Sequence, residues 1–131
     1  MNITVYSRNR LYQTFSKWDV PRDFADPMAN YLVYGYSPGS FFTSVLANDF
    51  HSAVARSHPA NTIEALKMLS GWIGECMPRE AHGGYDVVSN WCYLPPNARR
   101  QLLEKYELIY TEKEEVIMAL REESTIEPIL Y

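Results

Sequence analysis

The side chains best suited to metal binding are few and widely spaced. His51 and His58 are seven residues apart, about two turns of a continuous helix, which is too far for both to bind one ion unaided. Cys76, His82 and Cys92 match no spacing typical of zinc sites and lack a fourth ligand. We therefore expect no metal site, and the two cysteines are interpreted as small apolar residues in a reducing compartment.

The residues that could serve catalysis also lack the pattern that catalysis needs. Ser40 follows Gly39, but the Gly-x-Ser-x-Gly sequence of a strained nucleophile turn is absent. Glu112 and Glu115 could form an acid–base pair, but they lie on a strongly charged segment where exposure to solvent is the default. Acid–base catalysis needs carboxylates in a cleft with shifted pKa values. The sequence thus predicts a protein that is not an enzyme and that carries no cofactor.

Two short segments could bind an anionic small molecule. Gly39 and Ser40 are expected at the start of a helix, where free backbone N–H groups favour an anion, although one glycine is not a phosphate loop. Arg99 and Arg100 could bind a phosphate, and tyrosines could stack on a base. These residues define one hypothesis, a protein that binds and sequesters a nucleotide signal.

Aromatic content and uneven charge favour a protein partner instead. The chain has ten tyrosines among 14% aromatic residues, and tyrosine is enriched at protein interfaces, although tyrosines also span core and surface. Tyr34 and Tyr36 are the candidates. The net charge of −4 combines a basic first segment, which contains Arg8 and Arg10, with an acidic segment from Glu104 onward. Since Lys and Arg do not form one clustered face, we expect no direct binding of nucleic acid.

The elements that must position these residues are predicted to be helices. With 131 residues, 47% of them hydrophobic, the chain is predicted to form a single domain over residues 1–131. Cap and first-turn signals at Asp26-Pro27 and Ser37-Pro38, with a stop at Gly35, indicate a helical hairpin. We predict a mostly α fold, a compact bundle of six or seven short helices.

The ends of the chain are predicted to be less regular. Ile3 to Tyr6 have the pattern of a short strand, so residues 1–20 could form an extended arm, and the fallback is an α+β fold. Residues 124–131 could form a flexible tail.

Two later helices have the clearest signals. Asn61 and Glu64 resemble a capping box, and the period that follows predicts that Leu66, Leu69 and Ile73 are buried with Lys67 on the opposite side.

A second capping box, Thr111 and Glu114, begins a helix with a narrow apolar stripe of Val116, Ile117 and Leu120. We expect this helix to pack on the domain edge or against a second copy, with Glu112 and Glu115 facing Arg8 and Arg10 either of the same chain or of the partner in a homodimer.

Part of the chain is similar to proteins of tailed phages. Residues 29–50 (ANYLVYGYSPGSFFTSVLANDF), residues 61–66 and Trp72-Ile73 resemble segments of small uncharacterised tailed-phage accessory proteins, over about residues 21–92. The resemblance implies an origin in a phage genome and no catalytic residues. We also expect no membrane association and a place in the host cytoplasm, because no apolar run is long enough for a signal peptide or a membrane span.

Together these features favour a non-enzymatic phage accessory protein that binds a host protein and inhibits a bacterial defence system. Tyr34, Tyr36, Glu112, Glu115, Arg8 and Arg10 are the expected contacts. The nucleotide-binding hypothesis is the alternative.

Overall fold

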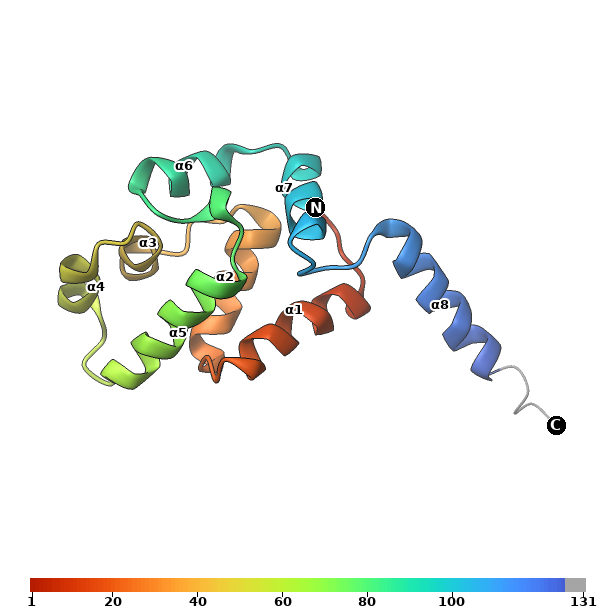
Figure 1. The fold of residues 1–131 in the computed structure, drawn as a ribbon, viewed down its shortest axis with the longest axis horizontal. Helices are drawn as coiled ribbons and strands as arrows, with labels where there is room; N and C mark the ends of the chain where they lie inside the picture. Colours follow the sequence, from red (N-terminus) through yellow and green to blue (C-terminus); the bar gives the residue numbers. More distant parts are fainter. Residues whose placement is uncertain (127–131) are drawn as a thin grey trace.

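Eight α-helices and one short 3-10 helix make up the structure, a computed structural model that describes the backbone of residues 1–126 and the side chains of residues 1–122 (Figure 1). Within that part of the chain there is no strand, and the predicted mostly α class is confirmed. The helices are α1 Val5–Lys17, α2 Arg22–Tyr34, α3 Ser40–Leu46, α4 Phe50–Arg56, α5 Ile63–Cys76, η1 Arg79–Ala81, α6 Tyr85–Tyr93, α7 Pro96–Lys105 and α8 Glu112–Ile126.

The strand predicted at Ile3 to Tyr6 is wrong, because helix α1 begins at Val5. The Oγ1 atom of Thr4 caps the helix by accepting a hydrogen bond from the Ser7 backbone N–H at 3.3 Å. Leu11 and Phe15, one turn apart, are buried against the core. Most of the proposed arm over residues 1–20 is therefore helical, and only residues 1–4 precede the helix.

Helix α2 begins earlier than its sequence signals predicted. Pro21 precedes the helix and its carbonyl oxygen accepts hydrogen bonds from the N–H groups of Phe24 and Ala25. Pro27 therefore lies inside the helix rather than in its first turn. Gly35 ends α2 in the left-handed conformation, with φ of 69°, which confirms the predicted stop.

Capping side chains set the starts of α4, α5 and α8. Asp49 caps α4, and its Oδ1 accepts a hydrogen bond from the Ser52 N–H at 3.2 Å. Thr62 rather than Asn61 caps α5, and its Oγ1 accepts from the Ala65 N–H at 3.0 Å. The capping box before α8 is confirmed by reciprocal hydrogen bonds between Thr111 and Glu114 of 3.2 and 3.1 Å. The tail predicted from residue 124 belongs to α8 as far as Ile126, and residues 127–131 lie outside the described residues.

Helix α2 forms the centre of the fold and contacts α1, α6 and α7. Met28, Tyr31 and Leu32 on this helix are fully buried. Helix α5 packs on α1, and its predicted phase is confirmed, since Leu66, Leu69 and Ile73 are buried and Lys67 is exposed.

The polar atoms of the large core side chains are hydrogen-bonded. Trp72 donates its Nε1–H to Thr14 Oγ1 at 2.9 Å, and Trp91 donates to the Tyr31 carbonyl oxygen at 3.1 Å. The Tyr31 hydroxyl donates to the Ala81 carbonyl oxygen at 2.8 Å. These bonds tie α1 to α5 and α2 to both α6 and η1, so the core has a fixed arrangement.

Helix α8 differs from the others because it extends away from the body of the domain (Figure 1). Near its start, α8 contacts α1 and, through Glu115 and Arg100, α7. No helix of residues 1–126 is long and apolar enough to cross a membrane.

Candidate interaction surfaces

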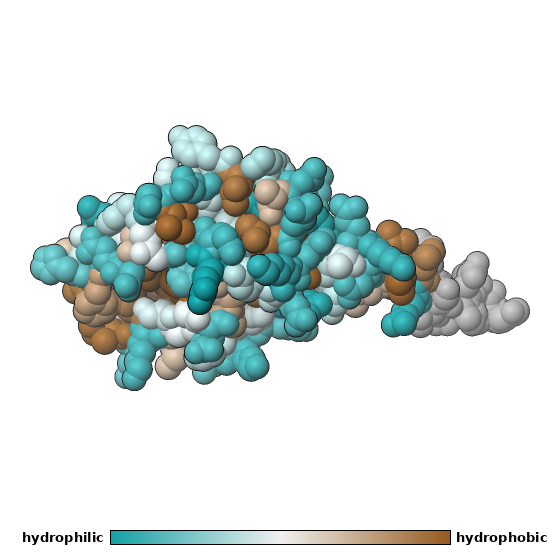
Figure 2. All heavy atoms as spheres, turned by 45° about the horizontal axis from the view of Figure 1, so that its top comes forward, coloured by the Kyte–Doolittle hydropathy of each residue, from teal (hydrophilic) through white to brown (hydrophobic). Residues whose placement is uncertain are grey.

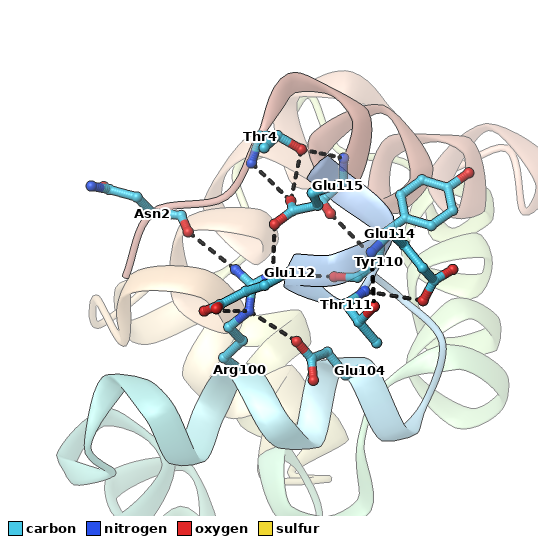
Figure 3. A network of polar contacts seen from close by, with 10 residues as sticks. Asn2, Thr4, Arg100, Glu104, Tyr110, Thr111, Glu112, Glu114 and Glu115 are labelled. Atoms are coloured by element: carbon cyan, nitrogen blue, oxygen red, sulfur yellow. Dashed lines mark hydrogen bonds and ion pairs between the residues drawn. The ribbon is translucent and has the colours of Figure 1, made fainter. Parts of the chain in front are cut away.

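A buried ion pair anchors the start of α8 to the body (Figure 3). Arg100 on α7 donates from Nη2 to Glu115 Oε1 at 2.6 Å, and both side chains are nearly inaccessible to solvent. The backbone N–H and the hydroxyl of Thr4 donate to Glu115 Oε2 at 3.0 and 2.7 Å. One carboxylate thereby joins α7, α8 and the residue that caps α1.

Arg100 has several further partners around the same point. Its Nε lies 2.9 Å from Glu104 Oε1 and 3.6 Å from Glu112 Oε1, and its other N–H groups bond the carbonyl oxygens of Asn2 and Tyr110. The guanidinium is thus fully engaged within the chain.

The surroundings of Glu115 favour its charged form. Burial by itself raises the pKa of the carboxyl, but hydrogen bonds from Ser7, Thr4 and Arg100 outweigh it and hold the pKa of Glu115 at about 2. The sequence-based interpretation of Glu115 as a contact for a partner is therefore replaced by a structural role. Glu112, with 82% of its side chain exposed, remains accessible.

This low pKa predicts a specific loss of stability in acid. Because the folded pKa of about 2 lies below the ordinary value of 4.5, the ionised group stabilises the fold above about pH 5, and the stabilisation is lost as the pH falls toward 2. Urea unfolding at a series of pH values measures the effect. Glu115→Gln should flatten the pH dependence in that range, and an unchanged dependence in this variant would contradict the assignment.

The face of α8 opposite Glu115 carries an exposed apolar stripe, Val116, Ile117 and Leu120. The exposed fractions of these side chains are 59%, 39% and 55%. Figure 2 shows apolar side chains gathered on the projecting helix. Within the described side chains from Val116 to Glu122, only Met118 is not exposed. The stripe is therefore available for contact with another molecule.

Three exposed tyrosines, Tyr34, Tyr36 and Tyr93, form what we call the tyrosine surface. The rings of Tyr34 and Tyr36 stack with centroids 5.4 Å apart. A Cβ atom on Gly35, between them, would lie 3.1 Å from the carbonyl oxygen of Cys92, so the α2–α3 loop and the end of α6 are in contact. Tyr93 follows Cys92 and is 85% exposed.

The buried Arg99 joins the two chain segments that carry the tyrosine surface. Its guanidinium is buried and donates to the carbonyl oxygens of Val33 and Leu94 on the two sides of the contact. Arg99 and Arg100, which the sequence suggested as phosphate ligands, are therefore both committed to bonds within the chain. A phosphate could reach them only by breaking these bonds.

Gly35 is expected to be essential for the geometry of this surface. Gly35→Ala should lower the free energy of unfolding by about 1–3 kcal/mol, because the residue has φ of 69° and a Cβ would lie 2.9 Å from Arg99 Nη1. Thermal unfolding measures the loss. Gly74→Ala is the control, since Gly74 lies within helix α5 and a Cβ there would meet open space, so this variant should lose no stability. An equally small effect of Gly35→Ala would contradict both the backbone strain and the contact with Arg99.

A groove runs between α1 and α2. Its larger cavity, of about 600 Å³, and a smaller one of about 180 Å³ share Arg8 and Tyr12. Arg8 lies over the Tyr12 ring, 5.7 Å from the centroid, and Tyr12 donates to Asp26 at 2.5 Å. Among the described residues, neither Arg8 nor Arg22 forms an ion pair. The larger cavity is lined by Val5, Arg8, Asn9, Tyr12, Phe15, Ser16, Val20, Arg22, Ala25 and Asp26.

The other residues suggested by the sequence lie elsewhere. Arg10 is half-buried with its guanidinium 4.5 Å from the centre of the Tyr110 ring. Gly39 and Ser40 are exposed at the start of the two-turn helix α3, with no atom within 4 Å of a Cβ on Gly39.

Potential metal ligands do not come together in the part of the chain that the structure describes, where no three His, Cys, Asp or Glu side chains form a suitable group. Burial raises the pKa of both Cys76 and Cys92, which disfavours their thiolate forms.

Comparison of the chain with protein-family models, with curated proteins and with solved structures found no match. The chemistry of the surfaces described above is therefore the basis for a functional proposal.

Proposed function

We propose that this protein acts by binding another protein, and that the tyrosine surface is the principal contact. The supporting observation is that Tyr34, Tyr36 and Tyr93 are exposed on two chain segments that the buried Arg99 joins. Tyrosine supplies a large contact area and a polar tip with few rotatable bonds. A surface that is already ordered loses little conformational entropy when it binds.

The proposed partner is a protein of a host bacterium. The segment that resembles tailed-phage accessory proteins, residues 21–92, includes Tyr34, Tyr36 and the loop between them. We propose that binding inhibits a bacterial defence system in the host cytoplasm, without catalysis by this chain.

The experiment compares three versions of the full chain as bait in lysate of the host bacterium. The wild type is expected to retain a specific protein, and Tyr36→Ala/Tyr93→Ala to lose it, with binding weakened by at least about tenfold. Phe50→Ala removes a similarly exposed aromatic side chain on α4 and should retain binding.

Purified partner and titration calorimetry then give the affinities. If the double variant and Phe50→Ala bind the partner as tightly as the wild type, the tyrosine surface is not the contact. Circular dichroism of each variant confirms that the helices are intact.

A further inference from the structure

We propose that the α1–α2 groove of one copy binds helix α8 of a second copy, so that two chains exchange their α8 helices in a symmetric dimer. This proposal does not depend on the proposed function. Its contacts do not involve Tyr36 or Tyr93, the two residues that are substituted to test that function.

The first argument is the state of α8 in a single chain. Its anchor, Glu115, lies in the first turn, and the helix then extends for about three turns away from the body (Figure 1). A helical segment of this length without tertiary packing is only marginally stable in water. A partner that covers Val116, Ile117 and Leu120 would supply the missing contacts.

The second argument is charge. Helix α1 carries Arg8, Arg10 and Lys17 and no acidic residue, which gives a net charge of +3. Apart from the buried Glu115, helix α8 carries four glutamates against Lys113 and Arg121, a net charge of −2. Pairing two α8 helices with each other would bring like charges together, whereas pairing α8 with α1 of a second copy joins opposite charges.

The third argument is the composition of the groove. Apolar side chains, among them Val5, Phe15 and Val20, lie beside Arg8 and Arg22, which form no ion pair with the described residues. An α8 helix presents the matching pattern, an apolar stripe with Glu112 and Glu114 beside it. The apolar stripe would fill the larger cavity and the glutamates would approach the two guanidinium groups.

Symmetry limits the number of copies in the assembly. Since each chain has one groove and one α8, a reciprocal exchange satisfies both surfaces and closes at two copies. Exposed ion pairs contribute to this contact, so it should weaken when salt is raised from about 0.1 M to about 1 M.

Sedimentation velocity of the full chain over a range of micromolar concentrations tests the proposal. We expect a dimer in the wild type. A groove variant, Arg8→Glu/Arg22→Glu, and a stripe variant, Val116→Asp/Leu120→Asp, should each be monomeric, with an association constant lowered by at least about tenfold. All four side chains are exposed, so the variants should remain folded, which circular dichroism verifies. Tyr36→Ala/Tyr93→Ala should still dimerise.

A mixture of the two defective variants gives the decisive result. The groove variant keeps an intact stripe, and the stripe variant keeps an intact groove. The two variants should therefore associate with each other, although neither associates with itself. A wild type that stays monomeric at every concentration would overturn the proposal. So would a groove variant that still dimerises, because the α8 helices would then be pairing directly.

Discussion

Replacing Glu115 with alanine is expected to lower the free energy of unfolding by about 3 kcal/mol. Removal of one partner from a buried ion pair costs about 3–5 kcal/mol, because the other charge stays buried without compensation. The lower end applies here, since Arg100 keeps Glu104 and Glu112 as neighbours. The substitution also removes the acceptor for both the N–H and the hydroxyl of Thr4. Urea unfolding near pH 7 measures the change.

Two further variants make this prediction specific. Glu122→Ala removes an exposed glutamate from the same helix and should change stability very little. Arg100→Met/Glu115→Leu removes both charges of the buried pair and should be more stable than Glu115→Ala, because no buried guanidinium is left without its carboxylate. If Glu115→Ala and Glu122→Ala have equal stabilities, the ion pair does not anchor α8.

Replacing Trp72 with alanine is expected to cost about 3–5 kcal/mol of unfolding free energy, as for other large aromatic side chains removed from a core. Trp72 is fully buried, its ring centroid is 4.5 Å from that of Phe15, and its Nε1–H donates to Thr14. The variant leaves a cavity between α1 and α5 and removes the hydrogen bond that joins them. The midpoint and slope of chemical unfolding give the free energy.

Helix α5 offers a matched control for this substitution. Ile63 is on the same helix but is 69% exposed, so Ile63→Ala should be nearly neutral. Trp72→Phe should fall between the two, because it keeps most of the packing and loses the bond to Thr14. A cost for Trp72→Ala no greater than that for Ile63→Ala would show that the core is assigned wrongly.

The helix boundaries that were predicted correctly have local determinants. The reciprocal Thr111 and Glu114 bonds and the left-handed Gly35 each depend on residues within one turn, so the sequence pattern contains them. The burial of Leu66, Leu69 and Ile73 followed from the helical period alone.

The N-terminal helix could not be predicted in the same way. Ile3 and Val5 alternate with polar residues as in a strand, which hid the capping role of Thr4. That residue is held by Glu115, which is 111 positions away, and no local signal reports such a contact.

The candidate site was also only partly accessible to sequence reasoning. Tyr34 and Tyr36 are exposed and adjacent, as a surface for a partner requires, whereas the contribution of Tyr93 depends on a contact between two distant loops. Arg99 and Arg100 were interpreted as possible phosphate ligands, but the structure buries both side chains. Their partners are backbone carbonyls and acids that only the fold brings near.

The link between Thr4 and Glu115 also has a consequence for the order of folding. During synthesis on a ribosome, α1 emerges long before the carboxylate that accepts hydrogen bonds from its capping residue. Closing so long a loop is entropically costly, so the contact should form late. Until residue 115 has left the exit tunnel, the nascent chain has α1 without its long-range support, and Ser7 without the Tyr110 N–H that bonds its hydroxyl. The first helix to be made should therefore be among the last to become fully stable.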